Sequence, residues 1–273
     1  MQIANKVFVV TGGGNGIGRE VVLNLVNKGA RVAAIDLSEK GLAETVRLAG
    51  SDDRLSTHVL DQSNREACMK LPEQVIAAHG SVDALLNIAG IIQPFVKVNE
   101  LDFSAVDHVM AVNFFGVVNL TKAFLPELLK RPEACLLNVS SMGAYAPVPG
   151  QTVYGASKAA VQLFTEGLHS ELMETNVQVT TVFPGAIATN ISVNSGVMSE
   201  QQATEQAKAA EGKKSQFKTT PAPVAAEVIV DAVQKKSYRV FIGSDAKMMD
   251  RLRRLMPERA AKMIYDNMKS LLS

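Results

Sequence analysis

The chain contains 273 residues with a formal net charge of +1, and 47% of its residues are hydrophobic and 20% charged. This composition is typical of a globular protein and gives no support for nucleic-acid binding, which favours a basic surface. No run of about eighteen apolar residues occurs, so we expect no membrane span. The histidines and cysteines lie at no metal-ligand spacing, so we expect no metal site. The N-terminal residues MQIANK show no signal-peptide pattern, and we therefore expect a cytoplasmic protein.

Short apolar runs alternate along the chain with apolar residues at helical spacing. The runs that predict strands cover residues 7–11, 30–36, 55–61, 82–90, 134–141, 177–185 and 238–243. The patterns that predict helices lie between them, up to residue 28 and at 38–49, 63–79, 103–130, 152–175 and 222–235. Strands that alternate with helices form a parallel sheet through right-handed crossovers. The sequence therefore predicts an α/β fold with a doubly wound parallel sheet of about seven strands, in a single domain over residues 1–244.

Two later segments differ from this pattern. Residues 190–220 are polar and contain few large apolar side chains, which predicts a mobile lid over a binding site. Residues 245–273 predict an amphipathic C-terminal helical extension, rich in methionine, in which a new helix begins at Pro257. Its apolar stripe has three interpretations: packing on its own or a neighbouring subunit, a roof over a substrate pocket, or contact with a membrane surface. We favour packing at the interface of a homodimer or homotetramer, with an edge on the pocket, and rank membrane contact last.

A glycine-rich stretch, TGGGNGIG, joins the first strand to the first helix. It contains five glycines over residues 11–18, although a plain turn needs one or two. Glycines let a ligand approach the backbone, and the N-terminus of a helix offers free N–H groups to a pyrophosphate. No Lys-Ser or Lys-Thr pair follows, so the stretch is not a nucleoside-triphosphate loop. The sequence indicates a dinucleotide site here, and a purely structural glycine turn is the alternative.

Asp36 ends the second predicted strand, eighteen residues after Gly18. A carboxylate at this place can accept hydrogen bonds from both ribose hydroxyls and repels a 2′-phosphate. Neither Leu37 nor Asn15 supplies a positive charge beside it. These residues favour NAD over NADP, and capping of the next helix is the alternative role for Asp36.

Tyr154 and Lys158 lie four residues apart in the motif YGASK on a predicted helix and therefore share a face. A nearby ammonium group stabilises a phenolate, so this pair can supply a general acid/base. Ser141 ends the fifth predicted strand, at the edge of the sheet where such folds bind ligands, and its hydroxyl is suited to hold a substrate oxygen. The alternative for Tyr154 and Lys158 alone is a surface helix pair.

In these motifs the chain resembles the short-chain dehydrogenase/reductase family over roughly residues 4–243. The matching elements occur in the family's order and comprise TGGGNGIG, Asp36, Asp61, NIAG at 87–90, Asn113, SS at 140–141, YGASK at 154–158, PG at 184–185 and Thr189. The resemblance implies a Rossmann fold and NAD(P)-dependent interconversion of CH–OH and C=O groups. It assigns Tyr154 as acid/base, Ser141 as substrate-orienting group and Lys158 as ribose-binding residue, with Asn113 holding a water molecule beside Lys158.

The resemblance also implies cofactor contacts elsewhere. Asp61 would hold the adenine amino group, residues 87–90 would line the adenosine side, and Ile187 and Thr189 would fix the carboxamide. The complete predicted cofactor set is Gly12, Asn15, Gly16, Ile17, Gly18, Asp36, Leu37, Asp61, Gln62, Asn87, Ala89, Gly90, Tyr154, Lys158, Pro184, Gly185, Ile187 and Thr189.

The expected substrate walls are residues 91–95 and 142–151, which are mostly apolar. We expect Gln93, Met142 and Gln151 to contact a small-molecule substrate, which this surface predicts to be a neutral, hydrophobic ketone or secondary alcohol. An NADP-dependent carbonyl reductase and a non-catalytic NAD redox sensor are the alternatives. The sensor is disfavoured because the catalytic set of Asn113, Ser141, Tyr154 and Lys158 is intact.

Overall fold

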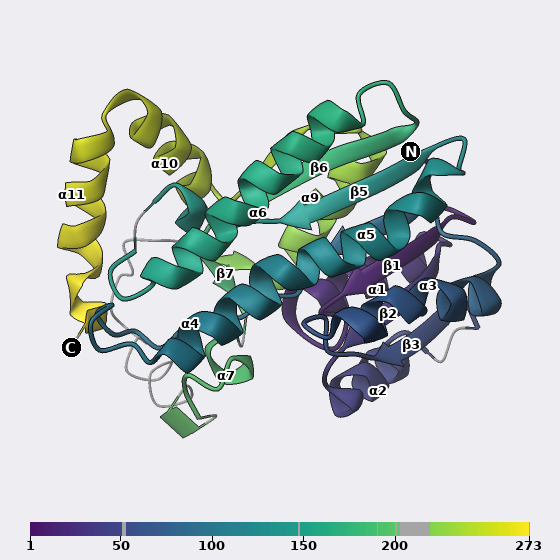
Figure 1. The fold of residues 1–273 in the computed structure, drawn as a ribbon, viewed down its shortest axis with the longest axis horizontal. Helices are drawn as coiled ribbons and strands as arrows, with labels where there is room; N and C mark the ends of the chain where they lie inside the picture. Colours follow the sequence, from purple (N-terminus) through teal and green to yellow (C-terminus); the bar gives the residue numbers. More distant parts are fainter. Residues whose placement is uncertain (51–52, 147, 190, 200, 203–218, 273) are drawn as a thin grey trace.

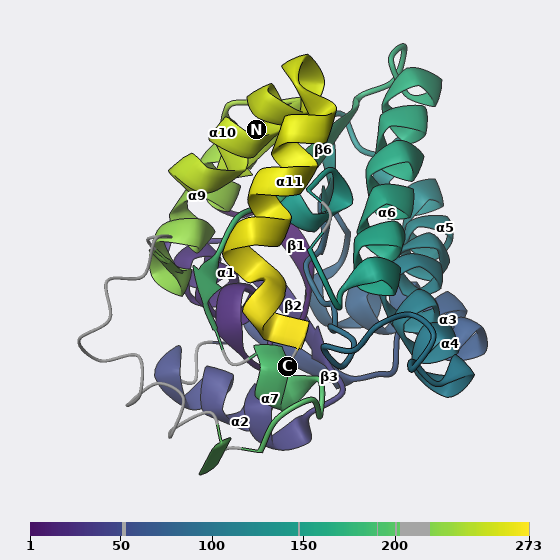
Figure 2. The same cartoon turned by 90° about the vertical axis from the view of Figure 1, so that its left-hand side faces the viewer.

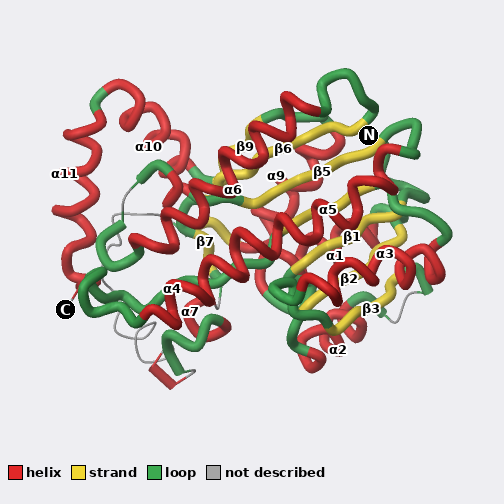
Figure 3. The backbone as a smooth tube through the Cα atoms, viewed as in Figure 1, coloured by secondary structure: helices red, strands yellow, loops and turns green. Residues whose placement is uncertain are grey.

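Seven parallel strands form the central sheet of the computed structural model, in the order β3-β2-β1-β4-β5-β6-β9 (Figure 1, Figure 3). The structure describes residues 1–273 except 51–52, 147, 190, 200, 203–218 and 273. The sheet strands are β1 (Val7–Thr11), β2 (Arg31–Asp36), β3 (Leu55–Val59), β4 (Ala84–Asn87), β5 (Ala134–Val139), β6 (Val177–Pro184) and β9 (Arg239–Ile242). This architecture confirms the predicted doubly wound α/β sheet.

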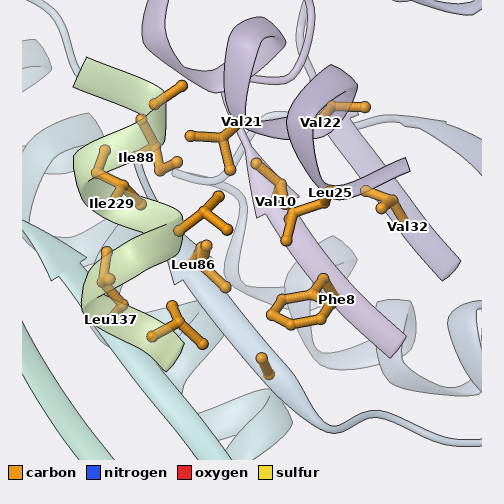
Figure 4. Packing of buried hydrophobic residues seen from close by; sticks show 14 of the residues in the cluster. Phe8, Val10, Val21, Val22, Leu25, Val32, Leu86, Ile88, Leu137 and Ile229 are labelled. Carbon is orange, nitrogen blue, oxygen red and sulfur yellow. The ribbon is translucent and has the colours of Figure 1, made fainter. Parts of the chain in front are cut away.

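Helices cover both faces of the sheet. The first face carries α1 (Gly16–Asn27), α2 (Glu39–Leu48) and α9 (Ala222–Gln234), and the second carries α3 (Arg65–His79), α5 (Gly116–Leu129) and α6 (Thr152–Glu171). Alternate residues of β1 point to opposite faces, so that Phe8 and Val10 join the first core and Val7 and Val9 the second. Figure 4 shows the first core, where α1 and α9 pack over β1 and β4. Burial on both faces explains why the first strand is a continuous apolar run.

The neighbours of β1 fix the position of the cofactor cleft. The chain leaves β1 toward β2 on one side, while β4 pairs with β1 on the other. The crossovers therefore diverge at the carboxyl end of β1, which is where open α/β sheets bind ligands. The glycine-rich stretch begins at this end, directly after Thr11.

The long helix predicted over residues 103–130 is divided into three parts. It comprises α4 (Phe103–Met110), a single π-helical turn η1 (Ala111–Phe115), and α5. The apolar pattern of the segment continues through the π turn, so the sequence did not predict it. Because one extra residue occupies this turn, the side chains before and after it change their angular positions around the axis.

The run Phe103–Leu129 has the length and composition of a helix that could cross a membrane. Half of its most apolar window is nevertheless buried inside the protein, and α5 packs against β4 and β5. Core helices of globular domains commonly have this composition. Among the described residues it is the one helix that meets these criteria.

The C-terminal extension consists of α10 (Ser244–Leu255), α11 (Pro257–Met268) and a 3-10 turn η3 (Lys269–Leu272), and a new helix begins at Pro257 as predicted. Figure 2 shows α10 and α11 in yellow beside each other. Their apolar stripe packs on the chain's own residues: Met249 and Ile264 form a buried cluster with Ala146. Packing within the subunit is therefore present in the extension, and its place at a subunit interface stays a prediction.

The predicted lid over residues 190–220 falls mostly on residues outside the described part of the chain. Its described portions include α7 (Ile191–Asn194) and β8 (Thr220–Pro221). β8 pairs in parallel with β7 (Ile187–Ala188), and this small second sheet was not predicted because strands of two residues have no readable alternation. The described end of the segment contacts the rest of the protein, since Asn15 Nδ2 donates to Asn194 Oδ1 at 3.2 Å and Ile92 N donates to Ser195 Oγ at 3.0 Å.

Two histidines near the edge strand β3 predict acid-sensitive stability. The hydroxyl oxygen of Ser56 lies 3.0 Å from Nε2 of His58 and 2.8 Å from Nε2 of His79. Burial lowers the pKa of both imidazoles below the usual value, so the folded protein takes up these protons at lower pH than the unfolded chain does. Their contribution to the free energy of unfolding is therefore present above about pH 6.5 and is lost as the pH falls through the folded-state pKa values.

We expect the urea midpoint to be lower at pH 5.5 than at pH 7.5, and this difference should shrink in the variant His58→Gln/His79→Gln. An equal pH dependence in both proteins would contradict this assignment.

Candidate active site

A cleft of about 540 Å³ opens at the carboxyl ends of β1, β2 and β4. Its walls are the glycine-rich loop, the ends of β2 and β3, the segment after β4, and residues around α7. The predicted cofactor residues that line it are Gly12, Asn15, Gly16, Ile17, Gly18, Asp36, Leu37, Asp61, Gln62, Ala89, Gly90 and Thr189. The fold thus brings most of the predicted cofactor residues together in one cleft, at the carboxyl edge of the sheet where such folds bind dinucleotides.

The glycines of the loop allow close approach by the protein's own atoms. A Cβ atom on Gly18 would overlap the carbonyl oxygen of Gly12, and one on Gly14 would lie 2.8 Å from the carboxyl carbon of Asp36. Gly16 differs, because its φ of 52° lies in the left-handed region and its nearest neighbour, Thr189, leaves room. The loop therefore packs tightly on β1 and β2, while the backbone at the start of α1 stays open toward the cleft. This arrangement fits a pyrophosphate at the N-terminus of α1.

Two side chains that the sequence analysis did not select hold this loop from behind. The Thr45 hydroxyl donates to the Gly13 carbonyl oxygen at 2.7 Å. Arg19 donates from its guanidinium group to the carbonyl oxygens of Gly14 and Gly41, and from Nε to the Thr45 hydroxyl at 3.1 Å. The Arg19 guanidinium is consequently engaged by backbone oxygens. The position of Arg19 in the helix directly after the glycine-rich loop was the one sign of this role in the sequence. The sequence does not show that its side chain points back to the loop.

Asp36 lies at the end of β2 with both carboxylate oxygens hydrogen-bonded to backbone. Gly14 N donates to Oδ2 and Ser38 N donates to Oδ1, each at 2.9 Å. The carboxylate thus faces the loop and forms part of the cleft wall. Helix α2 is capped by the Ser38 hydroxyl instead, which removes the capping alternative for Asp36. Among the described residues that line the cleft, the charged side chains are Asp36 and Asp61.

Asn87 is placed differently from its predicted role. Its side chain is 2% exposed and donates from Nδ2 to Asn138 Oδ1 at 2.8 Å, and Asn138 donates in turn to Thr165 Oγ1 at 2.9 Å. This buried chain of amides joins β4, β5 and α6, so the Asn87 side chain lies inside the sheet rather than in the cleft wall. The residues after it do reach the cleft, because the Thr11 hydroxyl oxygen accepts from the N–H groups of Ile88 and Ala89, both at 2.9 Å.

Tyr154 and Lys158 project from the first turns of α6 toward the end of β5. Burial raises the pKa of the Tyr154 hydroxyl, while a hydrogen bond with Ser141 lowers it, and the balance stays above the usual value. The Lys158 ammonium is buried and donates to the Val139 carbonyl oxygen at 3.1 Å, and burial lowers its pKa to about 8. The predicted pair therefore lies together with Ser141.

Asn113 reaches the same region because of the π turn η1. Its Oδ1 accepts from Ile91 N at 2.8 Å, and its Nδ2 donates to Ile91 O at 2.9 Å and to Ser157 Oγ at 3.0 Å. Gln62 Nε2 donates to the Val112 carbonyl oxygen within this turn at 2.8 Å. Gly90 fits between the two polar groups, since a Cβ there would lie 2.8 Å from Lys158 Nζ and 3.2 Å from Asn113 Oδ1. Asn113 and Lys158 are thus neighbours across Gly90, as the proposed water link requires.

Gln93 and Gln151, which are predicted to contact substrate, bond to the start of α6 and to each other, while Gln93 Nε2 and Gln151 Oε1 have no hydrogen-bond partner among the described residues. The side-chain oxygen of Gln93 accepts from the N–H groups of Val153 and Tyr154 at 2.8 and 2.9 Å, and thereby satisfies the start of α6. Gln151 Nε2 donates to the Gln93 carbonyl oxygen at 2.7 Å. Both side chains are buried, with exposed fractions of 1% and 4%. Met142 follows Ser141 and is half-buried beside the cluster formed with the C-terminal helices.

Pro184, Gly185 and Ile187 do not form part of the cleft wall described above, although Thr189 in the same segment does. They lie just beyond it, where β6 ends and the chain crosses toward Thr189. Gly185 N donates to the Ile242 carbonyl oxygen at 2.9 Å, which fixes the start of this segment to β9. The sequence prediction thus places this segment beside the cofactor cleft, and its specific contacts stay a prediction.

Comparison with known proteins agrees with this geometry. The family model for short chain dehydrogenases matches residues 6–200. The putative oxidoreductase SadH of Mycobacterium tuberculosis is 38% identical over 254 residues, which cover 92% of this chain and 91% of that protein. A short-chain dehydrogenase of Burkholderia cenocepacia in complex with NADP is 25% identical with a TM-score of 0.79, over 97% of this chain and 99% of that one. A Burkholderia phymatum dehydrogenase in complex with NAD has a TM-score of 0.84 at 24% identity, over 95% and 96% of the two chains, and shows the same fold. The chain therefore belongs to the short-chain dehydrogenase family, and it is an oxidoreductase for CH–OH and C=O groups that uses a nicotinamide cofactor.

Proposed function

We propose that this oxidoreductase interconverts a secondary alcohol and a ketone with NAD as its cofactor, and that Tyr154 is the general acid/base. The observation that carries the proposal is the placement of Tyr154 beside Ser141, one helical turn from a buried Lys158: a Cβ on Gly143 would lie 3.3 Å from the Ser141 hydroxyl oxygen and 3.3 Å from a ring carbon of Tyr154. Gly90 lines the cofactor cleft and lies against Lys158, which connects the catalytic groups to the cofactor site. The nicotinamide cofactor supplies the hydride acceptor or donor when it is bound.

The chain's own residues move the proton and hold the substrate oxygen. In the oxidation direction the Tyr154 oxygen takes the proton of the substrate hydroxyl, and in reduction it returns a proton to the carbonyl oxygen. Ser141 donates a hydrogen bond to the same substrate oxygen. Lys158 lies buried near Asn113, and its positive charge favours the phenolate form of Tyr154 when a cofactor also brings positive charge. Asn113 holds a water molecule through which the proton exchanges with solvent.

NAD is the proposed cofactor in preference to NADP because the lining of the cleft offers two carboxylates and no lysine or arginine among its described residues. Asp36 would accept from the ribose hydroxyls and repel a 2′-phosphate. The variant Asp36→Ala/Leu37→Arg should therefore reverse the preference, by on the order of tenfold or more in the ratio of dissociation constants. Titration of both proteins with NADH and NADPH measures this ratio. A wild-type protein that already binds NADPH more tightly would overturn the NAD assignment and support the NADP-dependent carbonyl reductase.

The proposed substrate is neutral and hydrophobic. Met142 and Tyr145 form the wall next to Ser141 and pack with Met249 and Met263 of the C-terminal helices. Leu272 also approaches this side, since a Cβ on Gly150 would lie 3.2 Å from its side chain. Methionine side chains adapt to irregular apolar ligands. A panel of apolar secondary alcohols and ketones, followed by nicotinamide absorbance, tests the function. Cofactor binding without any turnover would support the non-catalytic redox sensor instead.

We also propose that the protein acts in the cytoplasm as a homodimer or homotetramer. Large apolar side chains stay exposed on the helices of one face: Phe103 on α4 is 85% exposed and Leu163 on α6 is 72% exposed. Exposed side chains of this kind are commonly covered by a second copy. Light scattering of the full chain gives the number of subunits, and a monomer would contradict the proposal.

A further inference from the structure

A buried carboxylate at the start of the C-terminal extension contacts the segment that follows β6. Asp245 lies in the first turn of α10 and is 7% exposed. Its Oδ2 accepts from Ala186 N at 2.7 Å. This contact joins the extension, which lies outside the residues that match the family model, to the segment 184–189 beside the cofactor cleft.

Two glycines make room for this carboxylate. A Cβ atom on Gly185 would overlap both carboxylate oxygens of Asp245, and one on Gly243 would overlap Oδ1. Gly243 also has a φ of 93°, in the region that favours glycine, and it turns the chain from β9 directly into α10. The backbone of two separate segments is therefore shaped around one side chain.

The Asp245 carboxylate makes no capping hydrogen bond to its own helix. No side-chain hydrogen bond caps the start of α10, and Asp245 Oδ1 is buried without a hydrogen-bond partner among the described residues. Burial of a charged group with one unsatisfied oxygen is unfavourable, so a solvent-exposed acidic residue would suit the start of the helix better. The hydrogen bond from Ala186 N is thus the polar contact that offsets part of the cost of burying Asp245.

Both backbone polar groups of Ala186 form hydrogen bonds with other segments. Its N–H donates to Asp245, and its carbonyl oxygen accepts from Thr220 N at 2.8 Å. The residues that come next are Ile187, which pairs with Thr220, and Thr189, which lines the cofactor cleft. The two hydrogen bonds of Ala186 therefore hold the start of the stretch that leads to Ile187 and Thr189.

We propose that Asp245 is a positioning residue for cofactor binding, which fixes the 184–189 segment where it contacts the nicotinamide carboxamide. The proposal rests on the part of the proposed function that assigns Ile187 and Thr189 to the nicotinamide end. It also gives the extension a role in cofactor binding in addition to its apolar packing. The same first turn contacts the substrate side, since Tyr145 donates from its hydroxyl to the Ala246 carbonyl oxygen at 2.9 Å. This second contact provides a control on the same helix.

The test compares the binding of NAD⁺ with that of ADP-ribose, which has no nicotinamide. Isothermal titration of the full-length protein measures both dissociation constants. Asp245→Ala should weaken NAD⁺ binding about tenfold, the loss expected for one hydrogen bond to a charged group, and change ADP-ribose binding by less than about twofold. Asp245→Asn keeps an acceptor for Ala186 N and should recover most of the NAD⁺ affinity. Asp266→Asn, an exposed position on α11, controls for the loss of a negative charge.

Tyr145→Phe removes the other contact of the same turn and should leave the ratio of the two dissociation constants unchanged. Equal weakening of NAD⁺ and ADP-ribose by Asp245→Ala, or the same change in ratio in Tyr145→Phe, would overturn the proposal. If Asp245→Ala does not fold, Asp245→Val, which fills part of the same space but has no acceptor for Ala186 N, must raise the NAD⁺ constant relative to that of ADP-ribose, and an unchanged ratio would also overturn the proposal. A wild-type protein that binds ADP-ribose but no nicotinamide cofactor would instead contradict the proposed function itself, and the role of Asp245 with it.

Discussion

Replacement of Tyr154 by phenylalanine is expected to lower kcat about a hundredfold or more, because the positioned proton donor and acceptor is lost. The substitution removes one oxygen atom, whose hydrogen bond is with Ser141. The Gln93 oxygen bonds to the backbone N–H of Tyr154 and is unaffected, so the start of α6 should keep its place. The dissociation constant for NADH should therefore stay within about twofold of the wild-type value.

Steady-state kinetics with the best substrate of the alcohol panel measures this effect. Tyr265→Phe is the matched control, since this tyrosine is 53% exposed on α11 and lies in the C-terminal extension. Turnover close to that of the wild type would remove Tyr154 from the mechanism. A parallel loss of NADH binding would show that the hydroxyl supports the fold of the site rather than proton transfer.

Gly18→Ala is expected to weaken both NAD⁺ and ADP-ribose, by on the order of tenfold to a hundredfold, because the loop cannot keep its position. The added methyl group would overlap the Gly12 carbonyl oxygen and lie 3.0 Å from the Thr11 carbonyl oxygen, and backbone atoms yield less easily than side chains. The start of α1 must then move away from β1, which displaces the N–H groups that face the pyrophosphate. Overpacking of this kind usually costs about 1–3 kcal/mol of stability as well.

Isothermal titration and urea unfolding of the same variant measure the two effects. Gly167→Ala is the control, because a Cβ at this position in α6 has no neighbour within 4 Å and should leave binding unchanged. Unchanged affinity in Gly18→Ala would contradict the close packing of the loop. Gly18→Ala should therefore weaken the binding of both ligands, whereas Asp245→Ala should leave the binding of ADP-ribose nearly unchanged.

The alternation of strands and helices was sufficient to predict the sheet, because β1, β4 and β5 are buried on both faces and appear as apolar runs. The order of the strands was not predicted, since it depends on which strands pair and not on where each begins. The pairing of Ile187 with Thr220 was also not predicted, because strands of two residues are too short to show a periodic pattern. Element ends shifted by a few residues where capping by side chains, as by Asn64 on α3, decides the boundary.

The residue types at the site were predictable where a motif carries its own chemistry, as with Tyr154 and Lys158. The contacts that were not predicted are those of polar side chains whose partner is distant in sequence. Gln93 was expected to face a substrate, but it satisfies two N–H groups about sixty residues later, at Val153 and Tyr154. Asp245 resembles an ordinary acidic residue in the first turn of a helix, and only the fold brings it to Ala186. Spacing along the chain holds no information about such pairs.

The π turn at residues 111–115 makes the length of its helix unusually important. Successive residues of an α-helix are separated by about 100° around the axis, so the deletion of the extra residue would convert this turn into a regular α-helical turn and change the angular position of Asn113. Asn113 would then turn away from Ile91 and Ser157, while α5 would keep its place on the sheet. Deletions and insertions within α4–α5 are therefore expected to be excluded during the evolution of this protein, whereas the surface loop after the helix can change length without moving Asn113.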